Sequence, residues 1–161
     1  MLRGSRAADW YDRGCLLEAN DPKSAEAIVA YERALAGRPD LADAHNNLGR
    51  ILHERENLPH AEGHYRLALC LDPEIALYWF NLGVVVEDQG RRAEAIAAYE
   101  QALALDHRFA DAHYNLARLY EEIGRSAASS SPGSSRGDEL MLRRAVRHLL
   151  QYRALARAAG T

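Results

Sequence analysis

Residues 44–69 read AHNNLGRILHERENLPHAEGHYRLAL, and residues 78–103 read YWFNLGVVVEDQGRRAEAIAAYEQAL. The two stretches share Asn, Leu, Gly, Ala, Tyr, Ala and Leu at equivalent places, 34 residues apart. Self-similarity at a fixed period of this length is typical of proteins built from stacked structural repeats. The two stretches therefore predict a repeat protein, in which each unit buries its apolar side against its neighbours.

The same columns continue outward in both directions. Tyr31 and Ala34 lie one period before the first Tyr and Ala, and Asn115 and Leu116 lie one period after the second Asn and Leu. Apolar and small residues recur at helical spacing in both halves of each period. Asp-Gln-Gly at 88–90 marks a turn between the halves of one unit. Each unit is therefore predicted to be a pair of amphipathic helices.

These columns resemble the pattern of the tetratricopeptide repeat (TPR) family. The third unit carries most of that pattern, in Trp79, Leu82, Gly83, Ala95, Tyr99 and Ala102. Trp10 and Gly14 fit the first unit, and the resemblance covers residues 7–158, about four repeats. It implies an all-α fold, a right-handed α-α superhelical solenoid of antiparallel helix pairs. It also implies that small residues mark close helix contacts and that the tyrosines fill the space towards the next unit.

Four segments follow from this assignment. We expect residues 1–6 to be disordered, and residues 7–125 to hold repeats 1–3 with the first helix of repeat 4. The Ser/Gly-rich stretch at 126–138 predicts a flexible loop. Residues 139–161 predict a basic helix that is either the degenerate second helix of repeat 4 or a cap. Because Tyr152 falls where a repeat has Ala, this helix either docks on its own chain or swaps onto a neighbouring chain.

The resemblance places the candidate binding site on the first helix of each unit, which lines the concave face of TPR proteins. An Asn column lies there, and amide side chains both donate and accept hydrogen bonds. A ladder of amides could bind a peptide backbone without reading its sequence; alternatively, the amides are solvated or cap neighbouring helices. The predicted partner-binding groove consists of Asn46, Asn47, Arg50, Phe80, Asn81, Val84, Tyr114, Asn115 and Arg118.

The residue types in this groove also predict the chemistry of its ligand. Phe80 and Val84 make the centre apolar, and Arg50 and Arg118 flank it with positive charge. This combination predicts a ligand with an apolar centre and some acidic character. Two observations oppose that prediction. Asp12 interrupts the Asn ladder in the first unit, and acidic residues at 43 and 111 are expected on the same face.

No arrangement of residues predicts catalysis. His60 and His64 lie four residues apart, but no third ligand is evident and Glu62 does not fit the HExxH motif, so we expect a solvated helix face. His45 and His113 occupy the Trp column and are predicted to be packing residues. Phosphate-binding loops, nucleophile elbows and dinucleotide fingerprints are missing from the sequence. We therefore expect no metal, no cofactor, no small-molecule substrate and no enzymatic activity.

The last segment is basic. Residues 138–161 contain five arginines, at 143, 144, 147, 153 and 157, and two acidic residues, Asp138 and Glu139, so their net charge is 5 − 2 = +3. A basic amphipathic helix can bind nucleic acid, anionic lipid or an acidic partner. The alternative, which we favour, is a terminal cap whose apolar residues pack inward, namely Leu140, Val146, Leu149, Leu150 and Leu155.

Composition limits where the chain acts. The net charge of −3 over 161 residues gives no global attraction to nucleic acid. No apolar run approaches the roughly 20 residues that span a bilayer, and the N-terminus lacks the apolar region of a signal peptide. We therefore expect a cytoplasmic protein. Abundant Arg and Ala, with Lys23 as the sole Lys, favour a bacterial source.

The main functional hypothesis is a non-enzymatic scaffold that binds a protein or peptide segment in the concave groove. Two alternatives from other classes stay open. One is a regulatory TPR module associated with a bacterial transcriptional regulator, because similar arrays follow DNA-binding domains in such proteins. The other is an assembly module that forms homo-oligomers through its exposed end helices.

Overall fold

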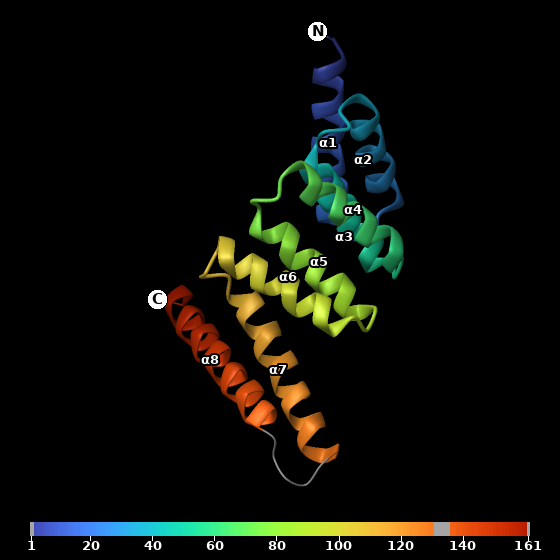
Figure 1. The fold of residues 1–161 in the computed structure, drawn as a ribbon. Helices are drawn as coiled ribbons and strands as arrows, with labels where there is room; N and C mark the ends of the chain where they lie inside the picture. Colours follow the sequence, from blue (N-terminus) through green and yellow to red (C-terminus); the bar gives the residue numbers. More distant parts are fainter. Residues whose placement is uncertain (1, 131–135, 161) are drawn as a thin grey trace.

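The computed structural model describes residues 2–130 and 136–160. Over these residues the chain forms helices in antiparallel pairs, which Figure 1 shows stacked in a row from α1 to α8. The helices are α1 (Leu2–Asn20), α2 (Ala25–Gly37), α3 (Ala42–Glu54), α4 (Leu58–Leu71), α5 (Ala76–Asp88), α6 (Arg92–Leu105), α7 (Ala110–Ser130) and α8 (Arg136–Ala159). The predicted all-α, right-handed solenoid of helix pairs is confirmed. Within this described part, no helix is long and apolar enough to cross a membrane.

The stacking follows the chain. Each pair packs internally, and each second helix also packs on the first helix of the next unit, as α2 does on α3, α4 on α5 and α6 on α7. The first helices α3 and α5 also contact each other directly. The first helices therefore form a row along the array, and the residues of the predicted groove lie on α3, α5 and α7 of that row.

The glycine and tyrosine columns meet inside each unit. A Cβ atom at Gly83 would lie 2.6 Å from a ring carbon of Tyr99, which is closer than real Cβ atoms approach. The equivalent pairs are Gly14 with Tyr31 and Gly49 with Tyr65. All three tyrosines are fully buried, and their rings pack on the hydrophobic core. The predicted role of these two columns is confirmed.

The turns inside the units show a local difference between repeats. Gly90 follows α5 with φ of 80°, and its N–H donates to the carbonyl of Glu87 at 2.7 Å. Glu56 takes the same place after α3, with φ of 61° and a bond to the carbonyl of His53 at 2.8 Å. Glycine adopts this left-handed conformation freely, whereas a residue with a Cβ does not. The predicted turn at 88–90 is confirmed, and its counterpart at Glu56 is strained.

The C-terminal helix packs on its own chain. The rings of Tyr114 on α7 and Tyr152 on α8 lie 5.3 Å apart, and those of His113 and His148 lie 5.2 Å apart. Ala145 is buried between the two helices, at the small position predicted for it. In this single chain α8 thus docks on α7, which is one of the two predicted arrangements.

Several predicted boundaries differ from the structure. Helix α1 begins at Leu2, so the prediction of disorder for residues 1–6 is wrong from residue 2 onwards; the buried Ala7 fixes the helix that these residues extend. Helix α7 runs to Ser130, because the alanines after Ser126 favour helix, and α8 begins at Arg136. Residues 126–130 and 136–138 of the predicted loop are therefore helical, and its residues 131–135 lie outside those described.

The buried side of α8 matches the predicted one only in part, since Leu149 and Leu155 are partly buried but the other three predicted residues are not. Leu140, Val146 and Leu150 are exposed, the last two by more than half of their surface. The residues that face the rest of the chain are instead Met141, Ala145, His148 and Tyr152. This set keeps the three- and four-residue spacing of one helix face. Leu140, Val146 and Leu150 therefore form an exposed apolar stripe on α8.

Candidate functional site

The predicted Asn column joins neighbouring first helices. The Nδ2 of Asn47 donates to the hydroxyls of Tyr31 at 3.3 Å and Tyr11 at 3.4 Å. The Nδ2 of Asn81 donates to the Oδ1 of Asn46 at 2.8 Å, and Asn46 in turn donates to Asn47 at 3.3 Å. These amides thus form a chain of hydrogen bonds that runs across α1, α3 and α5.

Asn115 continues this arrangement on α7. Burial and the negative charge of Glu87 raise the pKa of the Tyr99 hydroxyl, and a hydrogen bond from the Asn115 side chain acts in the opposite direction. All three members of the column therefore contact a neighbouring unit or its buried tyrosine. Their contact with a partner segment stays a prediction.

The two predicted arginines of the groove are already paired. The Nη2 of Arg50 lies 2.7 Å from the Oε1 of Glu18, a buried carboxylate whose other oxygen accepts from the hydroxyl of Tyr31 at 2.7 Å. The same arrangement recurs two units further along the array, in Arg118, Glu87 and Tyr99. Because each guanidinium is matched by a carboxylate, the two arginines bring little net positive charge to the groove. The prediction of an acidic groove ligand loses its main basis.

The sequence analysis did not predict the role of these two glutamates, although their position in the repeat indicates it. Glu18 and Glu87 each lie four residues after the glycine of their unit. In the second unit that place holds His53, and the following unit has Val84 where the arginine would stand. His53 bonds instead to Asp88 on α5, with Nε2 and Oδ2 2.6 Å apart. A unit with Glu at this position is therefore followed by a unit with Arg at the partner position, and the unit with His is followed by one with Val.

The apolar part of the predicted groove lies on α5 and α7. Phe80 is half-buried, with its ring 4.8 Å from that of Phe109, and Val84 is half-buried beside it. Tyr114 is 47% exposed. Leu77, three residues before Phe80 on α5, is also 47% exposed and was missed because apolarity alone did not distinguish it from core residues. These side chains offer apolar contact area on the row of first helices.

A polar hollow lies between α1 and α3. Its volume is about 390 Å³, and its lining consists of Cys15, Glu18, Ala19, Pro22, Asn47, Arg50 and Glu54. Burial, followed by the neighbouring Cys15, raises the pKa of Tyr11, whose hydroxyl accepts from the lining residue Asn47, to about 12. The hollow thus places two predicted groove residues beside a neutral tyrosine and a paired carboxylate.

Comparisons with known proteins agree with this architecture. The TPR repeat family matches residues 23–55 and 87–124. These two segments carry the sequence pattern of tetratricopeptide repeats. No curated protein sequence matches it.

Solved structures of MamA share the fold. One MamA crystal structure superposes with a TM-score of 0.79 at 18% identity, covering 96% of this chain and 80% of that one. A second has a TM-score of 0.69 at 21% identity, covering 94% and 92%. A fragment of MamA from Desulfovibrio magneticus RS-1 has a TM-score of 0.76 at 17% identity, covering 96% and 78%. At these identities the likeness concerns the fold.

Two TPR units contain a pair of histidines that the sequence did not predict. The Nδ1 atoms of His45 and His64 lie 3.0 Å apart, so the expectation of a solvated face is wrong for His64. The Nε2 of His45 lies 3.3 Å from the carbonyl oxygen of Pro39, which only accepts. That nitrogen therefore carries the proton, and the Nδ1 of His45 accepts from the Nδ1–H of His64. His45 is a packing residue, as predicted, with a polar role added.

The second pair lies in the fourth TPR unit. The Nδ1 atoms of His113 and His148 lie 2.9 Å apart, and the Nε2 of His113 lies 3.0 Å from the carbonyl oxygen of His107. Neither pair gains a third ligand. In the described part of the chain, no group of three or more His, Cys, Asp or Glu residues could hold a metal ion.

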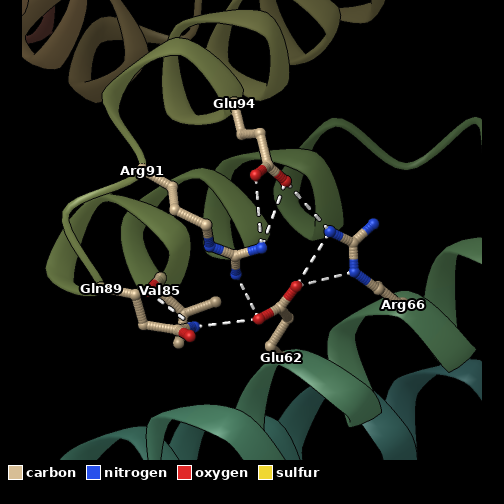
Figure 2. A network of polar contacts seen from close by, with 6 residues as sticks. All are labelled: Glu62, Arg66, Val85, Gln89, Arg91 and Glu94. Atoms are coloured by element: carbon tan, nitrogen blue, oxygen red, sulfur yellow. Dashed lines mark hydrogen bonds and ion pairs between the residues drawn. The ribbon is translucent and has the colours of Figure 1, made fainter.

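A further polar network links the second and third TPR units. Figure 2 shows Glu62 on α4 at its centre, with Arg66 at 2.9 Å, Gln89 at 2.9 Å and Arg91 around its two carboxylate oxygens. Glu94 on α6 bonds both arginines. Burial opposes the charge of Glu62, but these hydrogen bonds outweigh it and lower its pKa. The network fixes the boundary between the two units.

Proposed function

We propose that the chain is a non-enzymatic scaffold that holds a segment of a partner protein on the row of first helices. The observation that supports this proposal is the apolar area formed by Leu77, Phe80, Val84 and Tyr114 on that row. The charged groups beside it, Arg50 and Arg118, are paired within the chain. A surface with apolar contacts and matched charges suits an extended or helical segment with apolar anchors.

The amides have a supporting role in this proposal. Asn47, Asn81 and Asn115 are partly exposed and retain unused donor or acceptor capacity, because an amide can make up to four hydrogen bonds, whereas Asn46 is buried and already bonded to two of its neighbours in the chain of amides. A partner backbone would use that capacity, while the existing bonds hold the side chains in place. This pre-organisation lowers the entropic cost of binding.

Affinity capture from the native cell extract tests the proposal. The purified chain is compared with Leu77→Asp, which places a charge on the proposed surface, and with Val84→Thr, which keeps the shape of the side chain. Val29→Asp is the matched control, because Val29 is 45% exposed on the second helix α2. Circular dichroism verifies that each variant is folded.

The wild type and Val29→Asp should recover the same partner. Leu77→Asp should reduce its recovery at least tenfold, as expected when one interface contact worth about 1.4 kcal/mol is lost, and Val84→Thr should reduce it to a smaller extent. Equal recovery by all folded variants would contradict a binding surface on the first helices.

A further inference from the structure

The exposed stripe of α8 borders a groove at the open end of the array. We call it the end groove; its lining is Tyr114, Ala117, Arg118 and Glu121 on α7, and Leu142, Ala145, Val146 and Leu149 on α8. Its volume is about 250 Å³. Within the described residues nothing covers it, since Val146 is 56% exposed and Leu150, one turn further, is 59% exposed.

The third unit shows what such a groove accepts. Phe80 and Val84 lie one period before Tyr114 and Arg118, and Ile96 corresponds to Val146 when Ala95 is aligned with Ala145. In the third unit these side chains are partly buried against the core that includes α7. The end groove therefore repeats the surface on which α7 sits, one unit further along.

The helices that fill the internal positions share one pattern. The buried face of α7 carries Ala112, Leu116 and Leu119, which follow each other at intervals of four and three residues. Helices α3 and α5 present the equivalent faces Ala44, Leu48, Ile51 and Tyr78, Leu82, Val85. An occupant of the end groove would be a helix with the same apolar spacing.

The charges of α8 set a second requirement. Arg153 stands where the third unit has the apolar Leu103, and Arg157 follows one turn later on the same stripe. Both are exposed, as is Arg147, and none has an ion pair among the described residues. The acidic Glu121 of the groove is already bonded to Arg125 at 2.6 Å. The net charge around the end groove is therefore positive.

A second copy of this chain does not fit these requirements. Its first helix is the one internal-type helix whose packing face is free, and that face carries Asp9, Arg13 and Leu16 at the equivalent places. Only Leu16 is apolar, and Arg13 would enter a groove that is already bordered by arginines. Like charges in that position oppose association.

We propose that the end groove binds an amphipathic helix of a partner protein, one that carries acidic side chains beside an apolar stripe at i, i+4 and i+7. This interaction surface is separate from the proposed row of first helices, with which it shares only Tyr114 and Arg118. It uses the helix-in-groove mode of recognition, and the arginines select the charge of the helix.

Two synthetic peptides test the proposal against the full-length chain. Both keep the apolar face of residues 110–124, a segment of the helix that fills the equivalent internal position. In one peptide the positions outside the apolar face are Glu, and in the other they are Lys. The acidic peptide should bind at least tenfold more tightly, the order expected when two or three exposed ion pairs are exchanged for like-charge contacts.

Variants of α8 identify the surface. Val146→Asp should abolish binding, and the paired change Arg153→Glu with Arg157→Glu should reverse the preference towards the basic peptide. Val29→Asp, at the other end of the array, is the control and should leave binding unchanged. All substituted side chains are exposed, so the variants should fold.

Other results would overturn the proposal. Equal affinity for both peptides, or no binding of either, would rule out an acidic helix as the ligand of the end groove. Binding to phosphatidylserine vesicles that is lost with Val146→Asp, without peptide binding, would assign the surface to a membrane. Dimers in sedimentation equilibrium that disappear with Val146→Asp would assign it to a second copy.

Discussion

Replacing the two histidine pairs with a pair that the chain already uses elsewhere should make its stability less sensitive to acid. One period after His45 and His64 the third unit has Trp79 and Ala98, which line one small recess. The Nε1 of Trp79 donates to the carbonyl of Pro73 at 2.8 Å, in the same way as His45 bonds its own preceding carbonyl. The quadruple variant therefore carries His45→Trp, His64→Ala, His113→Trp and His148→Ala.

The sign of the effect follows from burial. Burial lowers the pKa of His45, and burial with a neighbouring histidine lowers the pKa of His64 and of His148. In the unfolded chain a histidine titrates near pH 6.5, at about its ordinary value. Below that pH the unfolded chain binds more protons than the folded chain, so the free energy of unfolding decreases. The stability is complete above about pH 6.5 and is lost as the pH falls towards the folded pKa values.

The size of the effect is set by the number of histidines that stay neutral. Each contributes a slope of up to about 1.4 kcal/mol per pH unit. Three such histidines give an upper limit of about 4 kcal/mol per unit, and because two of them are only half-buried we expect about 2–3 kcal/mol between pH 6.5 and 5.5. A domain of this size has a total stability of about 5–15 kcal/mol. The loss is therefore large enough to measure.

The surrounding charges modify each pair differently. His60 faces His64 and lowers its pKa further. Around His148, Arg147 and Arg144 lower the pKa, whereas Glu100 raises it. His60→Ala is thus a useful control, since His60 is exposed and bonded to Asn57 rather than to the pair itself. It should change the acid slope by only a small fraction of the wild-type effect.

Urea unfolding, followed by circular dichroism between about pH 7.5 and 5.5, measures these slopes. The wild type should lose about 2–3 kcal/mol over that interval, and the quadruple variant less than about 1 kcal/mol. Carboxylates contribute mainly below pH 5 and affect both proteins alike. If the quadruple variant unfolds cooperatively and loses as much stability as the wild type, the histidine pairs are not the source of the acid sensitivity.

Two smaller substitutions test the packing and the turns. Gly83→Ala should destabilise the chain by about 1–3 kcal/mol, because its Cβ would overlap the ring of Tyr99, whereas Gly63→Ala, with nothing within 4 Å, should stabilise it by about 0.5–1 kcal/mol; opposite signs in chemical denaturation are required. Glu56→Gly should raise the free energy of unfolding by about 1 kcal/mol, since it gives the strained turn the residue that Gly90 provides one period later, and a loss of stability would show that the left-handed backbone there carries no strain.

The fold was predictable because its determinants are periodic and local. The glycine and tyrosine of one unit touch each other at a nearly constant separation in sequence, 16 residues for Gly83 and Tyr99 and 17 for Gly14 and Tyr31, so the two columns repeat with the contact. The contacts of the Asn column were not predictable in the same way. Asn47 bonds tyrosines on α1 and α2, in the preceding unit, and a column in one sequence does not reveal which neighbour a side chain meets.

The predicted orientation of α8 was wrong in part, for a different reason. The stretch before α8 breaks the period, so the place of each α8 residue in the repeat had to be set by one anchor, Ala145. The inward residues were instead chosen for being apolar, which selected Leu140, Val146 and Leu150. A shift of one residue turns a helical side chain by about 100°, and the register set by Ala145 places Met141 and His148 inward.

Some of the missing contacts could have been read from the repeats themselves. Residues that touch change together between units. The second unit has His45 and His64 at two positions where the third unit has the large Trp79 and the small Ala98. Each unit thus acts as one sequence in an alignment, and residues that change together between units tend to touch. The histidine pairs were recoverable from this comparison, which needs only the chain itself.

The same comparison bears on the charge of a helix at the open end. At each internal boundary a glutamate of one unit meets an arginine of the next, in the pairs Glu18–Arg50, Glu62–Arg91 and Glu87–Arg118. Glu121 of the fourth unit occupies the position of Glu87, so by that rule it would pair with an arginine of a following unit. Arg125 of the same helix already satisfies Glu121. The α8 arginines at 147, 153 and 157 have no ion pair among the described residues, and they gain most from carboxylates that a docking helix supplies.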